Sequence, residues 1–162
     1  MVQVLRKQVL QEPEELIAHI LTRFHEMHRQ ELPVLIDLAD TVETVHVHDE
    51  WAPRGLARFL RILLVAMDQH MNKEEMILFP AMQAGGVDGI QFPIQVMRGD
   101  HEAHLEDIAQ IRALTNNLSL PHSECESWTS LYAGLQKFMD DLLEHIRLEN
   151  DALFPMFEEV RD

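Results

Sequence analysis

Cysteine is nearly absent from this chain of 162 residues: Cys125 is the single one, so neither an internal disulfide nor a thiolate-cluster metal site can form. Glycine and proline are sparse, with 6 and 7 residues, while leucine, alanine, glutamate and methionine are common. This composition favours helices over sheet. Basic residues are also few, since 13 Lys and Arg face 28 Asp and Glu and the net charge is −15. A surface this acidic repels phosphate backbones and anionic lipid, so we expect neither nucleic acid nor membrane as a partner.

Long hydrophobic runs are missing as well. The longest, residues 62–67, is far too short to span a bilayer, and residues 1–15 contain no apolar segment of the signal-peptide type. Together with the single cysteine, these absences predict a reducing, cytoplasmic location.

Histidine, by contrast, is abundant, with 10 residues, and most of the histidines lie in a repeated pattern. The motif His-x-x-x-Glu-x-x-x-Leu-Phe-Pro occurs at residues 70–80 and again 75 residues later at 145–155. A shorter motif, His-Glu-x-His, occurs at residues 25–28 and again 76 residues later at 101–104. The chain therefore resembles two copies of one unit. The Phe-Pro step that closes the longer motif is expected to pack in the core and to end a helix.

Hydrophobic residues recur at alternating spacings of three and four in four segments, which is typical of the helices of a bundle. Prolines suited to first turns, the Gly85-Gly86 stop and the capping pattern Ser123-x-x-Glu126 place the boundaries. The predicted helices span residues 13–46, 53–84, 93–118 and 123–160. Pro33 lies inside the first and is expected to kink or split it. We expect one domain over residues 1–162, an all-α antiparallel four-helix bundle with an internal two-fold repeat.

Four of the repeated polar residues lie on the apolar stripes of these helices: His70, Glu74, His145 and Glu149. They occupy places where leucine would otherwise be. An ionised glutamate in a core without a partner is destabilising by several kcal/mol or more, so two in equivalent places need compensation, which a metal ion supplies. Residues four apart lie on one helix face, roughly 5–6 Å apart at Cβ, so one turn can present both groups to a shared metal pair.

The other two helices each place two histidines on the core stripe, His25 with His28 and His101 with His104. Periodicity does not choose which member of each pair faces the core. Four or more imidazoles with two carboxylates and no thiolate suit two ions of iron, manganese or zinc, with the carboxylates bridging. The ferritin-like bundles use Glu-x-x-His instead, so the nitrogen-rich set fits the hemerythrin type of bundle better.

Several further stretches complete the pattern: Arg23-Phe24-His25, the run from His28 to Pro33, Lys73-Glu74-Glu75, His101-Glu102, Thr115-Asn116-Asn117 and Leu148-Glu149-Asn150. As a set, over residues 14–158, they resemble the hemerythrin-like domain of the iron–sulfur cluster repair di-iron proteins, the RIC or ScdA-like family of bacteria. The implied cofactor is two iron ions in an oxo- or hydroxo-bridged di-iron centre. The resemblance implies the metal ligands His25, His70, Glu74, His101, His145 and Glu149, with both glutamates bridging. It leaves His28 and His104 beside the ligands or in a channel.

The resemblance implies a stress-response protein that helps to repair iron–sulfur clusters damaged by oxidants or nitric oxide, through iron donation or reaction of the di-iron centre with nitric oxide. Damaged iron–sulfur proteins would be transient partners, and nitric oxide and oxygen the small ligands. The alternative is a hemerythrin-like protein that binds or senses oxygen or nitric oxide reversibly. The family commonly carries an N-terminal domain with an adjacent cysteine pair, which this sequence does not contain, and Cys125 is no substitute by position.

Overall fold

The computed structural model describes residues 12–121 and 125–158, and this part of the chain contains helices and no strands. In chain order the elements are α2 (Pro13–Ile20), η1 (Leu21–His25), α3 (Glu26–Val45), α4 (Leu56–Lys73), η2 (Glu74–Leu78), α5 (Phe79–Gln83), α6 (Gln91–Leu114), α7 (Glu126–Leu148), η3 (Glu149–Leu153) and α8 (Pro155–Glu158). The η elements are single π-helical turns, in which a backbone N–H bonds the carbonyl five residues earlier. None of these helices has the length and hydrophobicity that crossing a bilayer requires.

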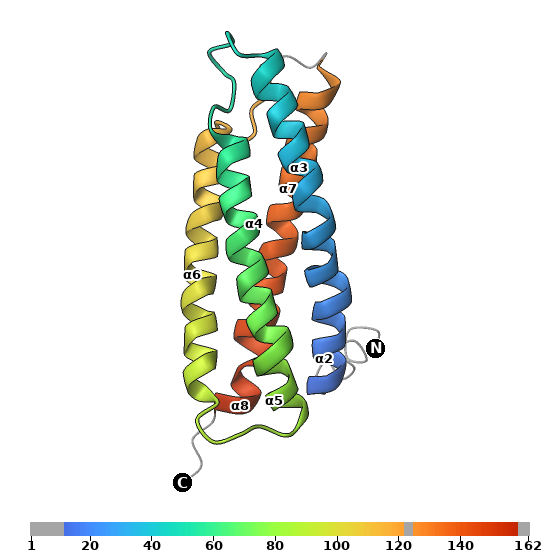
Figure 1. Ribbon diagram of the computed structural model, residues 1–162, viewed down its shortest axis with the longest axis vertical. Helices are drawn as coiled ribbons and strands as arrows, with labels where there is room; N and C mark the ends of the chain where they lie inside the picture. Colours follow the sequence, from blue (N-terminus) through green and yellow to red (C-terminus); the bar gives the residue numbers. More distant parts are fainter. Residues whose placement is uncertain (1–11, 122–124, 159–162) are drawn as a thin grey trace, which may run out of the picture.

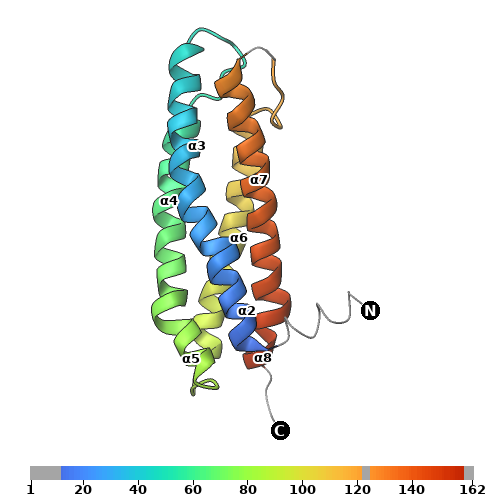
Figure 2. The same ribbon diagram turned by 90° about the vertical axis from the view of Figure 1, so that its right-hand side faces the viewer.

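The ten elements join into four rods, because each π-turn directly continues a helix and only Phe154 separates η3 from α8. One rod runs from α2 through α3, one from α4 through α5, one is α6, and one runs from α7 through α8. Figures 1 and 2 show the rods side by side along one long axis, with successive rods running in opposite directions. The predicted all-α, antiparallel four-helix bundle is confirmed.

Local hydrogen bonds define the helix ends beside two of the loops. The carboxylate of Glu43, on α3, accepts the backbone N–H groups of Gly55 at 2.7 Å and Ala57 at 3.0 Å, so it caps the start of α4. Pro53 was expected in the first turn of this helix but lies in the turn before it, because Gly55 takes a φ of 88° and α4 begins only at the next residue. The predicted end of the second helix at Gly85-Gly86 is confirmed, because the backbone N–H of Gly86 donates to the carbonyl of Ala81 at 2.8 Å.

The third predicted helix, residues 93–118, starts two residues too late and ends four residues too late. Helix α6 begins at Gln91, two residues before Pro93. It ends at Leu114 because Asn116, Asn117 and Leu118 all take positive φ angles, which no α-helix accommodates. The predicted capping residue Ser123 and the predicted last residue of the fourth helix, Val160, lie outside the described residues.

The expected split at Pro33 is wrong, since α3 continues from Glu26 to Val45. A proline inside a helix removes one backbone hydrogen bond. Here α3 packs on both α4 and α7 and buries Leu32, Leu35 and Ile36, which outweighs that loss. The departure from α geometry on this rod lies upstream, in η1.

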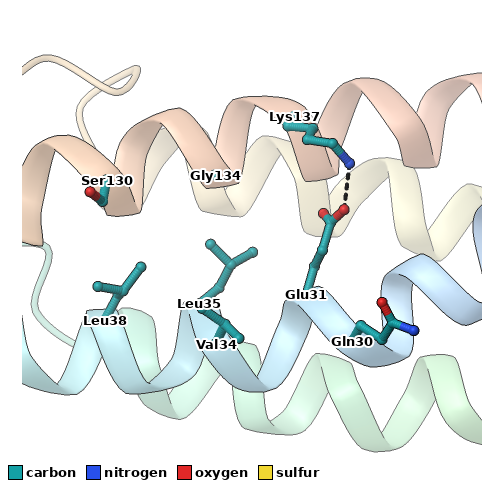
Figure 3. A pocket seen from close by; sticks show the side chains of 8 residues that line it. All are labelled: Gln30, Glu31, Val34, Leu35, Leu38, Ser130, Gly134 and Lys137. Atoms are coloured by element: carbon teal, nitrogen blue, oxygen red, sulfur yellow. Dashed lines mark hydrogen bonds and ion pairs between the residues drawn. The ribbon is translucent and has the colours of Figure 1, made fainter.

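Gly134 on α7 faces the side chain of Leu35 on α3 (Figure 3). A Cβ atom at this position would lie 2.7 Å from Cδ2 of Leu35, so glycine permits the approach. An open groove of about 330 Å³ runs along the seam. The ion pair between Lys137 and Glu31 bridges the two helices beside it.

Apolar side chains form two separate clusters along the bundle axis. On the first rod, Phe24 belongs to the smaller cluster and Leu32 to the larger one, with His25 and His28 between them. The other three rods also pass from one cluster to the other through buried histidine or glutamate residues. A polar layer therefore crosses the core where a bundle would normally be apolar.

Candidate metal centre

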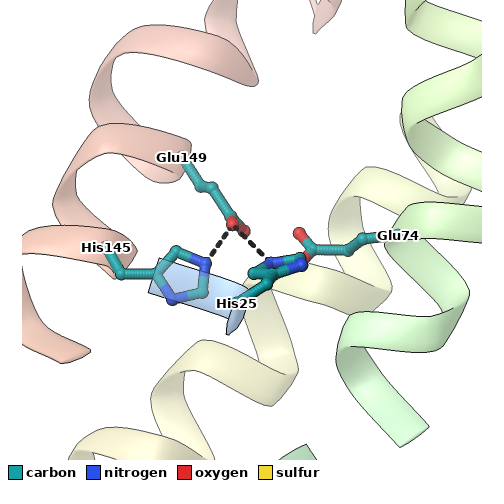
Figure 4. Close-up of side chains that lie close together, drawn as sticks. All are labelled: His25, Glu74, His145 and Glu149. Atoms are coloured by element: carbon teal, nitrogen blue, oxygen red, sulfur yellow. Dashed lines mark hydrogen bonds and ion pairs between the residues drawn. The ribbon is translucent and has the colours of Figure 1, made fainter. Parts of the chain in front are cut away.

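Two histidines and two glutamates from three rods meet in this polar layer (Figure 4). Each of His25, Glu74, His145 and Glu149 offers one atom, and these atoms lie within 4.8 Å of one another. Nε2 of His25 is 3.3 Å from Oε1 of Glu74, and Nε2 of His145 is 2.5 Å from Oε2 of Glu149. All four residues are buried. Such a group can hold one metal ion.

A second group of the same kind shares both carboxylates. His70, His101, Glu74 and Glu149 also offer atoms within 4.8 Å of one another. Nε2 of His70 is 3.3 Å from Oε1 of Glu74, and Nε2 of His101 is 3.0 Å from Oε1 of Glu149. The two glutamates thus lie between two pairs of histidines, which is the arrangement of two metal sites with bridging carboxylates.

The π-turns lie where three of the rods enter this layer. Glu74 opens η2 and Glu149 opens η3, while His25 closes η1. Each π-turn inserts one residue into the helical register and so changes which side chains face the bundle axis. Pro80 and Pro155 follow the two glutamates at the same distance and have no N–H for the α pattern. The expectation that the Phe-Pro steps end helices is wrong, since α5 and α8 continue through or from these prolines.

The Nδ1 atom of each of the four histidines is hydrogen-bonded to another side chain. The pairs are His25 with Glu75 Oε2 at 2.7 Å, His70 with Asp100 Oδ2 at 2.9 Å, His101 with Asn150 Oδ1 at 2.7 Å, and His145 with His28 Nε2 at 3.1 Å. An occupied Nδ1 orients the ring and leaves Nε2 to the metal. In all four rings Nε2 is the atom that faces Glu74 or Glu149.

The sequence reasoning missed the partners Glu75, Asp100 and Asn150. The available signal was adjacency, because each directly precedes or follows a candidate ligand. Consecutive helical residues point about 100° apart. A residue beside a ligand can therefore reach the neighbouring rod and hold the histidine there.

The remaining two histidines of the repeat belong to neither metal group. His28 is fully buried, and burial lowers its pKa to about 2, so it is neutral beside His145. His104 lies against the ring of His70, with centroids 5.1 Å apart, and burial lowers its pKa to about 4. His70 and His104 both line an opening of about 180 Å³ between α4 and α6, with Lys73 at its edge.

Comparison with known families decides what kind of bundle this is. The family model described as the hemerythrin HHE cation binding domain matches residues 16–157. The chain belongs to this family. The match covers all four rods and both metal groups, so the resemblance read from the sequence is confirmed.

Curated relatives of this hemerythrin domain are named for iron–sulfur cluster repair. The chain is 44% identical over 141 residues to a probable iron-sulfur cluster repair protein of Haemophilus influenzae, which covers 87% of this chain and 63% of the relative. It is 45% identical over 141 residues to the iron-sulfur cluster repair protein YtfE of Musicola paradisiaca, with 87% and 64% covered. It is 44% identical over 140 residues to YtfE of Yersinia pseudotuberculosis, which covers 86% of this chain and 63% of that relative. The chain thus spans less than two thirds of these relatives' length.

The hemerythrin domain of this chain fits a di-iron centre, and its unpaired polar atoms are the evidence. Nε2 of His25, His70 and His101, both oxygens of Glu74 and Oε1 of Glu149 are buried and form no hydrogen bond within the described part of the chain. Buried polar atoms without a partner are rare and destabilising. A pair of cations between the rings would satisfy all of them at once. The donors are imidazole nitrogen and carboxylate oxygen, a set that suits iron.

The electrostatics of the two carboxylates point the same way. Burial raises the pKa of Glu74 well above its usual value, and the charge of Glu149 raises it further. Burial would also raise the pKa of Glu149, but the neighbouring His145, Glu74 and His101 lower it overall. The two shifts oppose each other because the carboxylates share one desolvated space, which disfavours two negative charges there. Metal cations would supply the missing positive charge.

Proposed function

We propose that this hemerythrin domain holds two iron ions and takes part in repairing iron–sulfur clusters damaged by oxidative or nitrosative stress. The observation that carries the proposal is the sharing of Glu74 and Glu149 by two histidine pairs. The relatives named for cluster repair support it through their similarity over most of this chain. Damaged iron–sulfur proteins would be its transient partners, and nitric oxide and oxygen its small ligands.

In this proposal His25 and His145 would hold one ion and His70 and His101 the other, with Glu74 and Glu149 shared between the two. A bound iron pair supplies one-electron redox chemistry, affinity for diatomic ligands and iron that can be transferred. Aromatic rings keep water from the histidines. Phe24 stacks on His145 at 5.3 Å, Phe79 on His25 and Phe154 on His101, both at 5.7 Å between centroids.

A reconstitution assay tests the proposal. Iron-loaded protein is added to a cluster enzyme that nitric oxide has inactivated, and recovery of the enzyme is followed. We expect recovery with the wild-type chain and none with Glu149→Leu. The matched control is Glu144→Gln, because Glu144 is exposed on the same rod and pairs only with Arg147 among the described residues. If Glu149→Leu repairs as well as the control, the metal centre is not the repairing agent.

A second candidate function is reversible binding of oxygen or nitric oxide. The opening of about 180 Å³ beside His70 favours it, because a small ligand could approach the centre there. Exposure of the reduced protein to oxygen, followed by its removal, separates the two functions. Full return of the reduced spectrum supports a carrier, while lasting oxidation to the diferric state speaks against one.

A further inference from the structure

The two halves of the metal centre, the first with His25 and His145 and the second with His70 and His101, differ in charge. The difference lies in the groups behind the histidines, which are those that bond the Nδ1 atoms. The internal repeat makes the difference visible. Glu75 and Asn150 occupy equivalent places, one residue after each bridging glutamate, and both bond a histidine Nδ1 at 2.7 Å. One is a carboxylate and the other a neutral amide. Arg29 and Leu105 are also equivalent, since they lie 76 residues apart, as do the histidines beside them.

In the first half, Arg29 binds the carboxylate behind His25. Its Nη1 donates to Oε2 of Glu75 at 2.6 Å, and this is the same oxygen that bonds His25. The guanidinium is fixed by two further bonds, to Asp68 and Asn72, both at 3.1 Å. Asp68 is 49% exposed, so solvent screens it. A planar guanidinium held at three points keeps its charge on the Glu75 carboxylate.

In the second half, the carboxylate behind His70 has no such cation. Asp100 bonds His70 Nδ1 at 2.9 Å and is 37% exposed. Within residues 12–121 and 125–158, no ion pair joins Asp100 to a lysine or arginine, although Lys73 borders the same opening. Leu105 stands in the place that corresponds to Arg29 and is exposed.

Two other arginines near the layer do not cancel this difference. Arg23 pairs with Asp141 at 2.9 Å, and Arg98 donates to Glu158 through Nε, also at 2.9 Å. Each therefore brings its own counter-charge. Arg29 and Asp100 remain as the groups that set the two halves apart.

We propose that Arg29 is a positioning residue that makes the two metal sites electronically unequal, with the ferric ion favoured between His70 and His101 in the half-oxidised centre. This inference rests on the proposed di-iron function. A carboxylate that accepts the Nδ1 proton makes the imidazole a stronger donor. The Arg29 guanidinium offsets that effect at His25, while no lysine or arginine of the described residues pairs with Asp100 to offset it at His70. The stronger donor favours the more highly charged ion.

The experiment is a ferricyanide titration of the iron-loaded chain. Each ferricyanide takes one electron from the diferrous centre and becomes ferrocyanide. The amount of half-oxidised centre is read by electron paramagnetic resonance, and ⁵⁷Fe Mössbauer spectra assign the ferrous and ferric ions. We expect Arg29→Leu, which copies the other repeat, to lower the equilibrium constant for the half-oxidised state about tenfold, within the range of effects of groups behind metal-bound histidines. Arg29→Lys keeps the positive charge and should retain most of that state.

Asp100→Asn should lower the same constant, because it removes the uncompensated carboxylate from the other half. The double variant Arg29→Leu/Asp100→Asn should restore the half-oxidised state with the asymmetry inverted, a recovery that no loss of packing would produce. Asp100 is partly exposed, so its variant answers the question even where the Arg29 variant does not fold. Wild-type constants in both single variants, at two irons per chain, would overturn the inference alone. A wild-type chain that binds no iron pair would overturn the proposed function as well.

Discussion

Replacing Glu74 by glutamine should change the stability of this protein in opposite directions with and without iron. Glu74 is fully buried, and among the residues that the structure describes neither of its oxygens has a hydrogen-bond partner. Because burial raises the pKa of Glu74 well above its usual value, folding at neutral pH must either bury this charge or bind a proton, and either is destabilising by about 1–3 kcal/mol or more. Glutamine has nearly the same shape and carries no charge. In metal-free protein, Glu74→Gln should therefore raise the free energy of unfolding by about 1–3 kcal/mol.

In iron-loaded protein the same substitution removes a bridging ligand. A ligand present at about 100 times its dissociation constant stabilises the folded state by about 2.7 kcal/mol, and much of this should be lost. Anaerobic urea unfolding, once with a chelator and once with ferrous iron, measures both values. The exposed control Glu144→Gln should shift neither by more than about 0.5 kcal/mol. Equal destabilisation of Glu74→Gln in both conditions would show that Glu74 is an ordinary structural residue, against the reasoning above.

Three further predictions concern groups around the layer. Glu43→Ala should lower the free energy of unfolding by about 1–2 kcal/mol in urea titrations, because it removes the cap of α4, and an unchanged value would contradict the capping role. Although burial raises the pKa of Asp141, pairing with Arg23 and with a neighbouring lysine outweighs that effect and lowers the pKa below 3.8. Its contribution to stability is then present above pH 3.8 and lost as the pH falls through the lowered pKa, so Asp141→Asn should flatten acid unfolding below pH 4. Asn150→Ala frees Nδ1 of His101 and should weaken iron binding about 10–100-fold in chelator competition; unchanged affinity would mean that the amide does not orient the ring.

The rods and the polar layer could be predicted from the sequence because both follow from periodicity. Glu74 and Glu149 stand on otherwise apolar stripes, and a helix places residues four apart on one face. The structure brings both glutamates and four histidines together in that layer. The choice of His25 over His28 did not follow from periodicity, since both positions lie on the same stripe. It came from the family resemblance.

The π-turns and the partners of the histidines could not be read from spacing. A π-turn inserts one residue, and an average period of 3.6 does not show a single insertion. The bond from His70 to Asp100 joins α4 to α6, so it depends on how the two helices are rotated against each other. The continuity of α3 through Pro33 likewise depends on packing against α4 and α7.

Counting the metal in the purified protein, with its optical and Mössbauer spectra, tests the central claim most directly. Protein from iron-supplemented cells should contain about two iron ions per chain, held in two distinguishable sites, and should lose them in Glu149→Leu. A fully folded chain with one zinc ion or no metal would contradict the di-iron centre.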